Sequence, residues 1–174
     1  MERQGFKGVA LAVTQGDQIA YLQGYGSAGG GRPMTAQTPL YIGSQSKSFT
    51  ALAVAQLVEQ GLIDLRAPVQ TYLPWFTTAD PAAAAKITVS HLLHHTSGLS
   101  EAGFTAIIPL DATREQAVRA LASAELTAEP GAEFQYFNLN YVALAAVGRV
   151  YVGPVSGLMV AAKNDAAHRA IRDN

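Results

Sequence analysis

The chain has 174 residues, of which 49% are hydrophobic and 14% are charged. This composition suits one globular domain and excludes an intrinsically disordered segment, which needs low hydrophobicity and high charge. A net charge of −1 carries no basic excess, so neither nucleic-acid binding nor electrostatic recruitment to a membrane surface is predicted.

The N-terminal part of the sequence predicts a hairpin followed by a loop. Two short hydrophobic runs, residues 8–14 and 18–23, flank a Gly-Asp turn, as in a β-hairpin. Residues 24–39 are rich in Gly, Ser, Thr and Pro, which favours a loop. Gly24–Gly29 matches the G-x-G-x-x-G pattern of dinucleotide sites, but Gly30–Pro33 cannot open the helix that such a site needs. We therefore expect a flexible loop there and no cofactor.

The remainder of the chain is predicted to be mostly helical. Hydrophobic residues at three-and-four spacing indicate a helix over residues 44–60, ended by Gly61. A hairpin followed by helices places the chain in the α+β class. Because an isolated hairpin is only marginally stable, either helices cover it or further strands are missing from this chain. Three more helices are expected over residues 88–94 behind the N-cap Thr88, residues 113–124 behind the N-cap Thr113, and residues 138–150.

Cysteine is absent, so the sequence has no disulfide framework, no thiolate metal site and no cysteine nucleophile. Residues 1–8 lack the apolar stretch of a signal peptide. Residues 141–162 combine Arg149 with a Gly-Pro break, which argues against a membrane span. The localisation is not predicted by these features.

His91, His94 and His95 form an H-x-x-H-H cluster. A helix would place His91 and His95 on one face, as in a metal site. Leu92, however, stands where a metalloprotease has glutamate, and no further histidine or cysteine lies nearby to complete a zinc set. Hydrogen bonding at a helix end, with Thr96-Ser97-Gly98 as the stop, is the favoured interpretation, and no metal is predicted.

Ser44-Gln45-Ser46-Lys47 forms an S-x-x-K motif at the predicted start of a helix. On a helix Ser44 and Lys47 face each other, and the helix N-terminus presents free N–H groups that can stabilise an oxyanion. A buried lysine near this positive helix end is pushed toward its neutral form, which can take the proton of a serine nucleophile. The alternative is a serine N-cap beside an exposed lysine, without chemistry.

A second constellation, Tyr136-Phe137-Asn138, follows a Pro-Gly turn at the mouth of a predicted helix. A tyrosine beside a lysine can carry protons, because a nearby cation favours the phenolate. An asparagine amide can hydrogen-bond both a substrate amide and a lysine. The alternative is an aromatic packing residue next to an asparagine cap.

Together these segments resemble the serine β-lactamase and penicillin-binding-protein superfamily, in its class C-like branch of β-lactamases, DD-peptidases and esterases. The resemblance extends from about Gly8 to Val150, in several blocks that follow the family's order. The blocks are residues 41–52, 57–61, 68–74, 87–99 and 130–141.

The resemblance implies a β-lactamase/DD-peptidase-like fold and acyl transfer through a serine ester. Substrates of such enzymes include β-lactams, D-Ala-D-Ala-type peptides and small esters. By resemblance, Ser44 is the nucleophile and Lys47 its proton partner. Tyr136 is the second proton carrier, Asn138 orients the substrate amide, and Gln45 lines the pocket. No metal or cofactor is implied.

The sequence departs from the family in one respect. Members carry a K-T-G or H-x-G motif on a strand after the helical region, and neither motif follows Asn138. The resemblance therefore implies one partial domain over residues 1–174, with the hairpin and loop at 8–43, the helical part at 44–150, and a divergent or truncated end at 151–174.

Two functions are compatible with such a partial domain. The first is a weak or inactive serine hydrolase, because losing one oxyanion donor costs about 2.7–4 kcal/mol of transition-state stabilisation. The alternative is a non-catalytic fragment or pseudoenzyme that binds a peptide or protein partner through an open groove and an edge strand.

Overall fold

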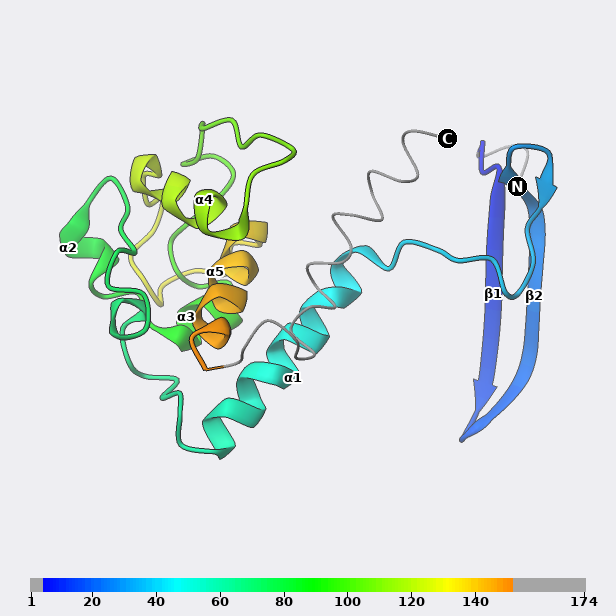
Figure 1. The fold of residues 1–174 in the computed structure, drawn as a ribbon, viewed down its shortest axis with the longest axis horizontal. Helices are drawn as coiled ribbons and strands as arrows, with labels where there is room; N and C mark the ends of the chain where they lie inside the picture. The colour runs from blue at the N-terminus through cyan, green and yellow to red at the C-terminus, as the bar shows by residue number, and fades with distance from the viewer. Residues whose placement is uncertain (1–4, 152–174) are drawn as a thin grey trace. The chain divides into compact units, whose positions relative to one another are not determined.

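The fold was analysed in a computed structural model, which describes residues 5–151. The chain divides into two compact units, the first ending at Tyr41 and the second beginning at Ile42. Within the described range the first unit holds the strands and the second holds the helices (Figure 1). The expected order of a hairpin followed by helices, and with it the α+β class, is confirmed. The expected divergent end at 151–174 lies outside the described residues apart from Tyr151.

The first unit is a three-stranded antiparallel sheet in the order β1-β2-β3. Strand β1 (Gly8–Gln15) pairs with β2 (Gln18–Gly29) across the predicted turn, with Gly8 opposite Gly26 and Gln15 opposite Gln18. The register shifts between Val13 and Thr14, which marks a β-bulge. The short strand β3 (Arg32–Pro33) pairs with the far end of β2. The predicted hairpin is therefore confirmed.

The loop expected over residues 24–39 is wrong in two places, because β2 continues to Gly29 and β3 occupies Arg32–Pro33. Gly24 explains how the strand can continue. A Cβ atom at this position would lie 2.5 Å from the carbonyl oxygen of Met34, so only glycine lets the two backbones approach so closely. The G-x-G-x-x-G run thus lies within a strand and does not open a helix.

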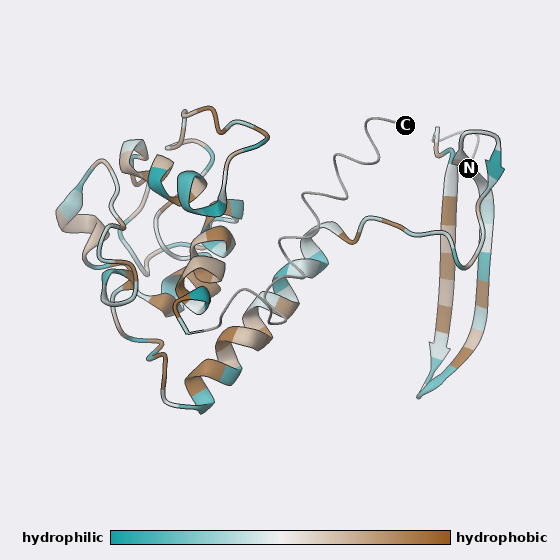
Figure 2. Ribbon diagram, in the orientation of Figure 1, coloured by the Kyte–Doolittle hydropathy of each residue, from teal (hydrophilic) through white to brown (hydrophobic). Residues whose placement is uncertain are grey.

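Hydrophobic residues recur along both strands of the hairpin (Figure 2). Several of their large side chains are more than 40% exposed. These side chains are Val9, Leu11, Val13, Ile19, Tyr21 and Leu22. The hairpin therefore presents apolar surface that the three-stranded sheet does not bury.

Up to Tyr151, where the described residues end, the second unit contains five α-helices joined by turns and longer loops. In chain order they are α1 (Ser46–Glu59), α2 (Pro81–Ala84), α3 (Val89–Leu93), α4 (Arg114–Arg119) and α5 (Asn138–Arg149), with 3₁₀ turns at Gly43–Gln45, Val69–Thr71 and Ala120–Ser123. None of the helices in residues 5–151 combines the length and apolar character needed to cross a bilayer.

Two predicted helix starts are confirmed by their capping geometry. The Thr88 side chain accepts a hydrogen bond from the His91 backbone, and the Thr113 side chain accepts one from Gln116. In each case the third helical residue bonds back to the backbone of the cap, which completes a capping box. Helix α4 is shorter than the predicted segment, because the chain tightens into a 3₁₀ turn after Arg119.

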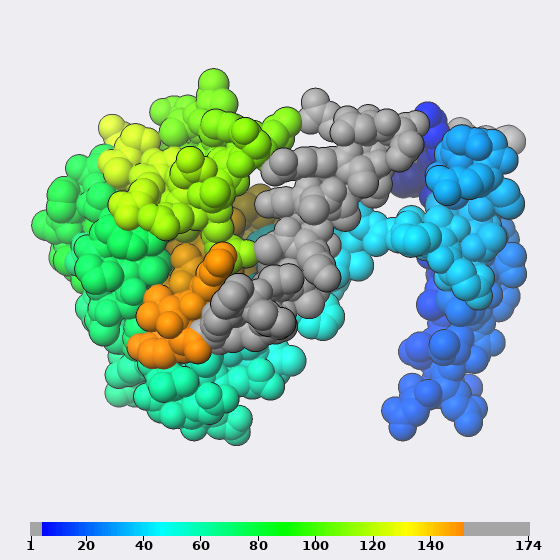
Figure 3. Space-filling model, in the orientation of Figure 1, coloured from blue at the N-terminus to red at the C-terminus, as the bar shows by residue number. Residues whose placement is uncertain are grey.

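Helix α5 forms the centre of this unit. It contacts α1, α3 and α4. In the space-filling view the orange residues of α5 border the green residues of the segments before it (Figure 3). Its inward face is small and apolar, and Ala143, Leu144 and Val147 are fully buried. Each large apolar side chain buried in this way contributes about 1.5–3 kcal/mol, so packing keeps the N-terminus of α5 in place.

A short stretch after α3, residues 95–98, joins this core to the chain that leads into α5. The His95 carbonyl accepts a hydrogen bond from the backbone of Gln135, and the Thr96 carbonyl accepts one from Gly131. The Gly98 carbonyl accepts one from Thr127. This 95–98 segment thereby fixes the path of residues 127–135, chiefly by backbone bonds.

Replacing Gly98 by alanine is expected to destabilise the second unit strongly. Gly98 has φ +81°, and an added Cβ would lie 2.1 Å from the Ala128 carbonyl oxygen. Gly61, with φ +71°, is a matched control, because a Cβ added there would meet nothing within 4 Å and only backbone strain of about 1–2 kcal/mol applies. The G98A variant should lose about 2 kcal/mol more free energy of unfolding than G61A in urea titrations followed by circular dichroism. Equal losses would contradict the close approach of these two segments.

Candidate active site

Ser44 lies at the entrance to helix α1. It sits in the 3₁₀ turn Gly43–Gln45, and the α-helix begins two residues later than the sequence predicts, at Ser46. Ser44 and Lys47 still face each other, since Lys47 Nζ donates a hydrogen bond of 3.1 Å to Ser44 Oγ. Lys47 is half-buried, between the buried lysine and the exposed lysine that the sequence left open. The turn therefore presents a hydroxyl and an amine side by side.

Tyr136 and Asn138 reach the same place from the N-terminal end of α5. Ser44 Oγ and Tyr136 Oη share a hydrogen bond of 2.6 Å, although 92 positions separate them in the chain. Lys47 Nζ donates a second bond, of 2.8 Å, to Asn138 Oδ1. Four side chains that the sequence analysis singled out thus form one connected network.

The electrostatics of this network act on the phenol. The interaction with Lys47 lowers the pKa of Tyr136 most, the bond to Ser44 lowers it further, and slight burial opposes both. Lys47 Nζ lies 4.8 Å from the centroid of the Tyr136 ring. A nearby cation stabilises the phenolate, so this tyrosine yields its proton more readily than a free one. The arrangement can therefore move a proton between a hydroxyl and a phenol beside a positive charge.

Gln45 is the one predicted site residue that stands apart from the network. Its side chain is exposed, and within residues 5–151 it makes no side-chain hydrogen bond. Its backbone N–H donates to the Ile42 carbonyl, which helps to close the 3₁₀ turn that carries Ser44.

The three clustered histidines have different surroundings. The His91 ring accepts a bond from the Thr88 backbone, and the His94 ring contacts the Ser90 carbonyl, so the expected helix-end bonding is confirmed for these two. His95 is instead buried, with its ring stacked on Tyr136 at a centroid distance of 4.6 Å. No group of three or more metal-ligating side chains occurs within the described part of the chain.

Sequence reasoning missed the layer beneath the site. Asn140 and Ser97 are completely buried, and Ser97 Oγ donates a bond of 2.8 Å to Asn140 Oδ1. Asn140 also contacts the His95 ring with its amide nitrogen. One signal was present in the sequence. Asn140 stands among the apolar residues of a predicted helix, and a buried asparagine needs a polar partner.

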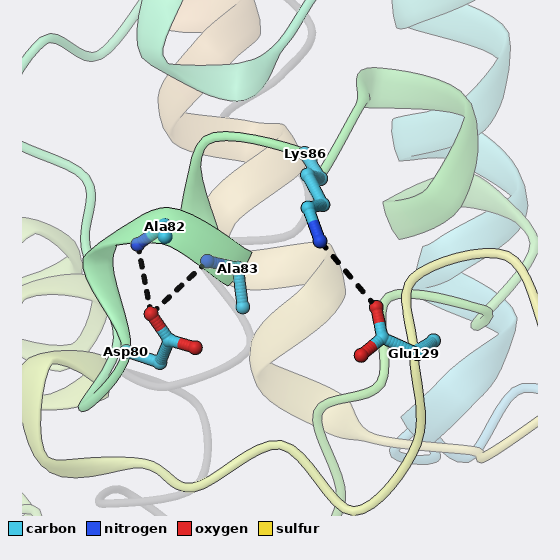
Figure 4. Close-up of polar contacts among 5 residues, drawn as sticks. All are labelled: Asp80, Ala82, Ala83, Lys86 and Glu129. Carbon is cyan, nitrogen blue, oxygen red and sulfur yellow. Dashed lines mark hydrogen bonds and ion pairs between the residues drawn. The ribbon is translucent and has the colours of Figure 1, made fainter.

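A groove in the second unit lies apart from these residues. It is lined by Ala79, Asp80, Ala83 and residues 125–129, and none of the network residues lines it. Two of its three acidic side chains, those of Asp80 and Glu129, are already engaged. Asp80 caps helix α2 by accepting from the Ala82 and Ala83 backbones, and Glu129 lies 3.7 Å from Lys86 (Figure 4). We therefore assign no chemistry to this groove.

Comparison with known proteins identifies the family to which this α+β chain belongs. Residues 1–159 match the Beta-lactamase family, and the chain belongs to that family. The expected resemblance to the β-lactamase and penicillin-binding-protein superfamily, and the fold that it implied, are confirmed.

Named relatives include an esterase and an amidohydrolase. Esterase EstB of Burkholderia gladioli is 36% identical over 182 residues, which cover 95% of this chain and 45% of EstB. The structure of EstCE1, a hydrolase with promiscuous acyltransferase activity, matches with a TM-score of 0.75 and 29% identity, over 94% of this chain and 46% of EstCE1. A D-stereospecific amidohydrolase from Streptomyces sp. gives a TM-score of 0.72 and 28% identity, over 92% of this chain and 48% of its own. The chain thus spans less than half the length of these relatives.

Replacing Lys47 by methionine is expected to raise the pKa of Tyr136, because Lys47 is the largest cause of its lowered value. In the unsubstituted chain Tyr136 should titrate below the ordinary tyrosine value of about 10 and before Tyr141, whose pKa is raised by burial and by Tyr136. The ring Cζ resonances of ¹³C-labelled tyrosine, followed by NMR through the alkaline range, measure both. Lys86→Met, which removes a lysine paired with Glu129, is the control. A Tyr136 titration that K47M leaves unmoved would contradict the assignment.

Proposed function

We propose that this chain carries the acylation site of a serine hydrolase, with Ser44 as the nucleophile. The observation that carries the proposal is the 2.6 Å bond between Ser44 Oγ and Tyr136 Oη, within a network that includes Lys47 and Asn138. A weak nucleophile such as serine needs an adjacent base oriented by a third group. Membership of the Beta-lactamase family supports the same chemistry, since named relatives are an esterase and an amidohydrolase.

In acylation, Tyr136 begins as the phenolate that its lowered pKa favours. Ser44 Oγ bonds to the carbonyl carbon of the substrate while its proton passes to this phenolate oxygen, which becomes the phenol. The proton then moves to the leaving nitrogen or oxygen as the bond from that atom to the carbonyl carbon breaks. Lys47 Nζ donates to Ser44 Oγ and lies over the Tyr136 ring, so we assign it the role of orienting the serine and stabilising the phenolate, in place of the base that the sequence predicts. In deacylation, water adds to the ester carbon and gives a proton to Tyr136, which returns it to Ser44 Oγ as the ester bond breaks.

The proposed substrates are β-lactams, D-Ala-D-Ala-type peptides and small esters. These compounds share a carbonyl carbon with a nitrogen or oxygen leaving group. Asn138 Oδ1 accepts from Lys47, which leaves the NH₂ group of the same amide to donate to a substrate carbonyl. Gln45, exposed beside Ser44, is proposed to line the pocket. No metal or cofactor takes part in the proposed steps.

Covalent labelling tests the nucleophile. Incubation of the 174-residue chain with a fluorophosphonate or a fluorescent penicillin should add one label to Ser44, located by mass spectrometry of the digested protein. Ser44→Ala should abolish the label. Ser48→Ala is the matched control, because this serine is also exposed at the start of α1. Turnover is expected to be about 10²–10³-fold weaker than in a complete site, since neither K-T-G nor H-x-G follows Asn138.

Failure to label folded, soluble protein with either reagent would overturn the proposal. It would favour the alternative of a non-catalytic fragment that binds a peptide or protein. A label that persists in S44A, or that S48A removes, would equally reject Ser44 as the nucleophile.

Tyr136→Phe is expected to slow labelling of Ser44 by about 10²–10⁴-fold, because it removes one hydroxyl group and keeps the ring. The stacking of this ring on His95 should survive, so the free energy of unfolding should change little. The rate of label incorporation reports the loss of reactivity, and the urea midpoint of the same variant reports any loss of stability. An unchanged labelling rate would exclude Tyr136 as the proton acceptor.

A further inference from the structure

His95 is enclosed by the segment that carries Tyr136. Only 6% of this residue is exposed. Its ring lies against Tyr136 at 4.6 Å, against Tyr141 at 5.1 Å and edge-on to Phe134 at 5.9 Å between centroids. The ring therefore supports the very side chain that bonds to Ser44.

The hydrogen bonds of His95 define its protonation. Its Nδ1 accepts a bond of 3.2 Å from the Phe137 backbone N–H. The Asn140 side-chain nitrogen lies 3.3 Å from the same atom. Asn140 Oδ1 is taken by Ser97 Oγ, which orients the amide so that its NH₂ group faces the ring. An atom that receives two donors carries no proton, so the proton of the neutral ring is on Nε2.

The main chain of His95 completes the enclosure. Its carbonyl accepts a 2.7 Å bond from the Gln135 backbone, so His95 binds the residue before Tyr136 with its carbonyl and the residue after it with its ring. The backbone of His95 has φ +55°, a left-handed conformation that non-glycine residues rarely adopt. That unusual conformation lets carbonyl and ring act on the same segment.

We propose that His95 is a positioning residue, which in its neutral Nε2–H form holds Tyr136 at the distance from Ser44 that proton transfer needs. The catalytic consequence rests on the proposed function, whereas the structural part does not. Protonation at Nδ1 would place a third N–H against the two donors of Phe137 and Asn140, and the Tyr136 segment would move away.

The groups that face His95 set the pH at which this happens. They are Lys47 from α1, Tyr136 from the segment just before α5, and Tyr141 from α5 itself. Burial lowers the pKa of His95, and the positive charge of Lys47 lowers it further. The neutral form is therefore retained at neutral pH, and it is lost as the pH falls through a value below the ordinary histidine pKa of about 6.5.

The first test measures the tautomer and the titration of the His95 ring. Long-range ¹H–¹⁵N NMR spectra of the full chain should show the Nε2–H tautomer for His95 at neutral pH and a titration of this ring below the ordinary histidine pKa of about 6.5. The ring resonances of Tyr136 should shift together with the His95 titration. A proton on Nδ1, or Tyr136 resonances that ignore the His95 titration, would overturn the proposal.

The second test uses two replacements with opposite properties. His95→Asn keeps an acceptor near the Nδ1 position, tolerates a left-handed backbone and cannot titrate in this range. His95→Phe keeps a ring but has no acceptor. We expect labelling of Ser44 to slow by about 10–10²-fold in H95F and by less than about tenfold in H95N. The acid limb of the rate against pH should disappear in H95N and persist in the control His94→Asn.

The outcomes separate this proposal from the proposed function. If Ser44 of the unsubstituted chain is not labelled, the proposed function is wrong. The positioning role is then decided by NMR alone: the Tyr136 resonances should follow the His95 titration, and this pH dependence should be lost in H95N. If the chain labels and H95N retains the acid limb, His95 is not the group that titrates and the proposal is wrong. If H95F does not fold, the H95N profile and the tautomer decide alone.

Discussion

The backbone hydrogen bonds between the 95–98 segment and the chain approaching α5 are the constraint on which the site depends. Each side-chain bond within the Ser44, Lys47, Tyr136 and Asn138 network is at least partly exposed and contributes only about 1 kcal/mol. Bonds of that size do not hold two segments together against the entropy of the side chains involved. The backbone bonds at His95, Thr96 and Gly98 bring Tyr136 to α1, and the exposed network then forms between groups already in place.

This division between support and chemistry explains why buried polar residues lie under an exposed network. Tyr136 is 47% exposed and therefore accessible to a substrate, whereas Asn140 and Ser97 are completely buried. Every buried polar side-chain atom in the described range has a hydrogen-bond partner. A fully satisfied polar layer permits one arrangement of its members, since any other would leave a buried donor or acceptor unpaired. The support is thus specific as well as stable.

Local signals predicted much of the fold from the sequence. Thr88 marked a helix start as an N-cap and Thr113 as the first residue of a capping box, because both signals are complete within four residues. The continuation of β2 could not be predicted in this way, because the reason for Gly24 is the backbone of Met34, ten positions away. The candidate site is a longer-range case. The S-x-x-K spacing predicted that Ser44 and Lys47 face each other, but only the family resemblance predicted that Tyr136 belongs to the same site. His95 was considered as a ligand or a helix end, since its partners Phe137 and Asn140 lie more than 40 positions downstream.

The sequence separation of Ser44 and Tyr136 has a consequence for biosynthesis. During translation the serine leaves the ribosome 92 residues before the phenol that lies beside it in the folded chain. At ordinary elongation rates this is an interval on the order of 5–20 s. Throughout that interval the nascent polypeptide holds a serine no more reactive than any other, and the hydroxyl meets its activating partner only once the N-terminal end of α5 has been synthesised and docked.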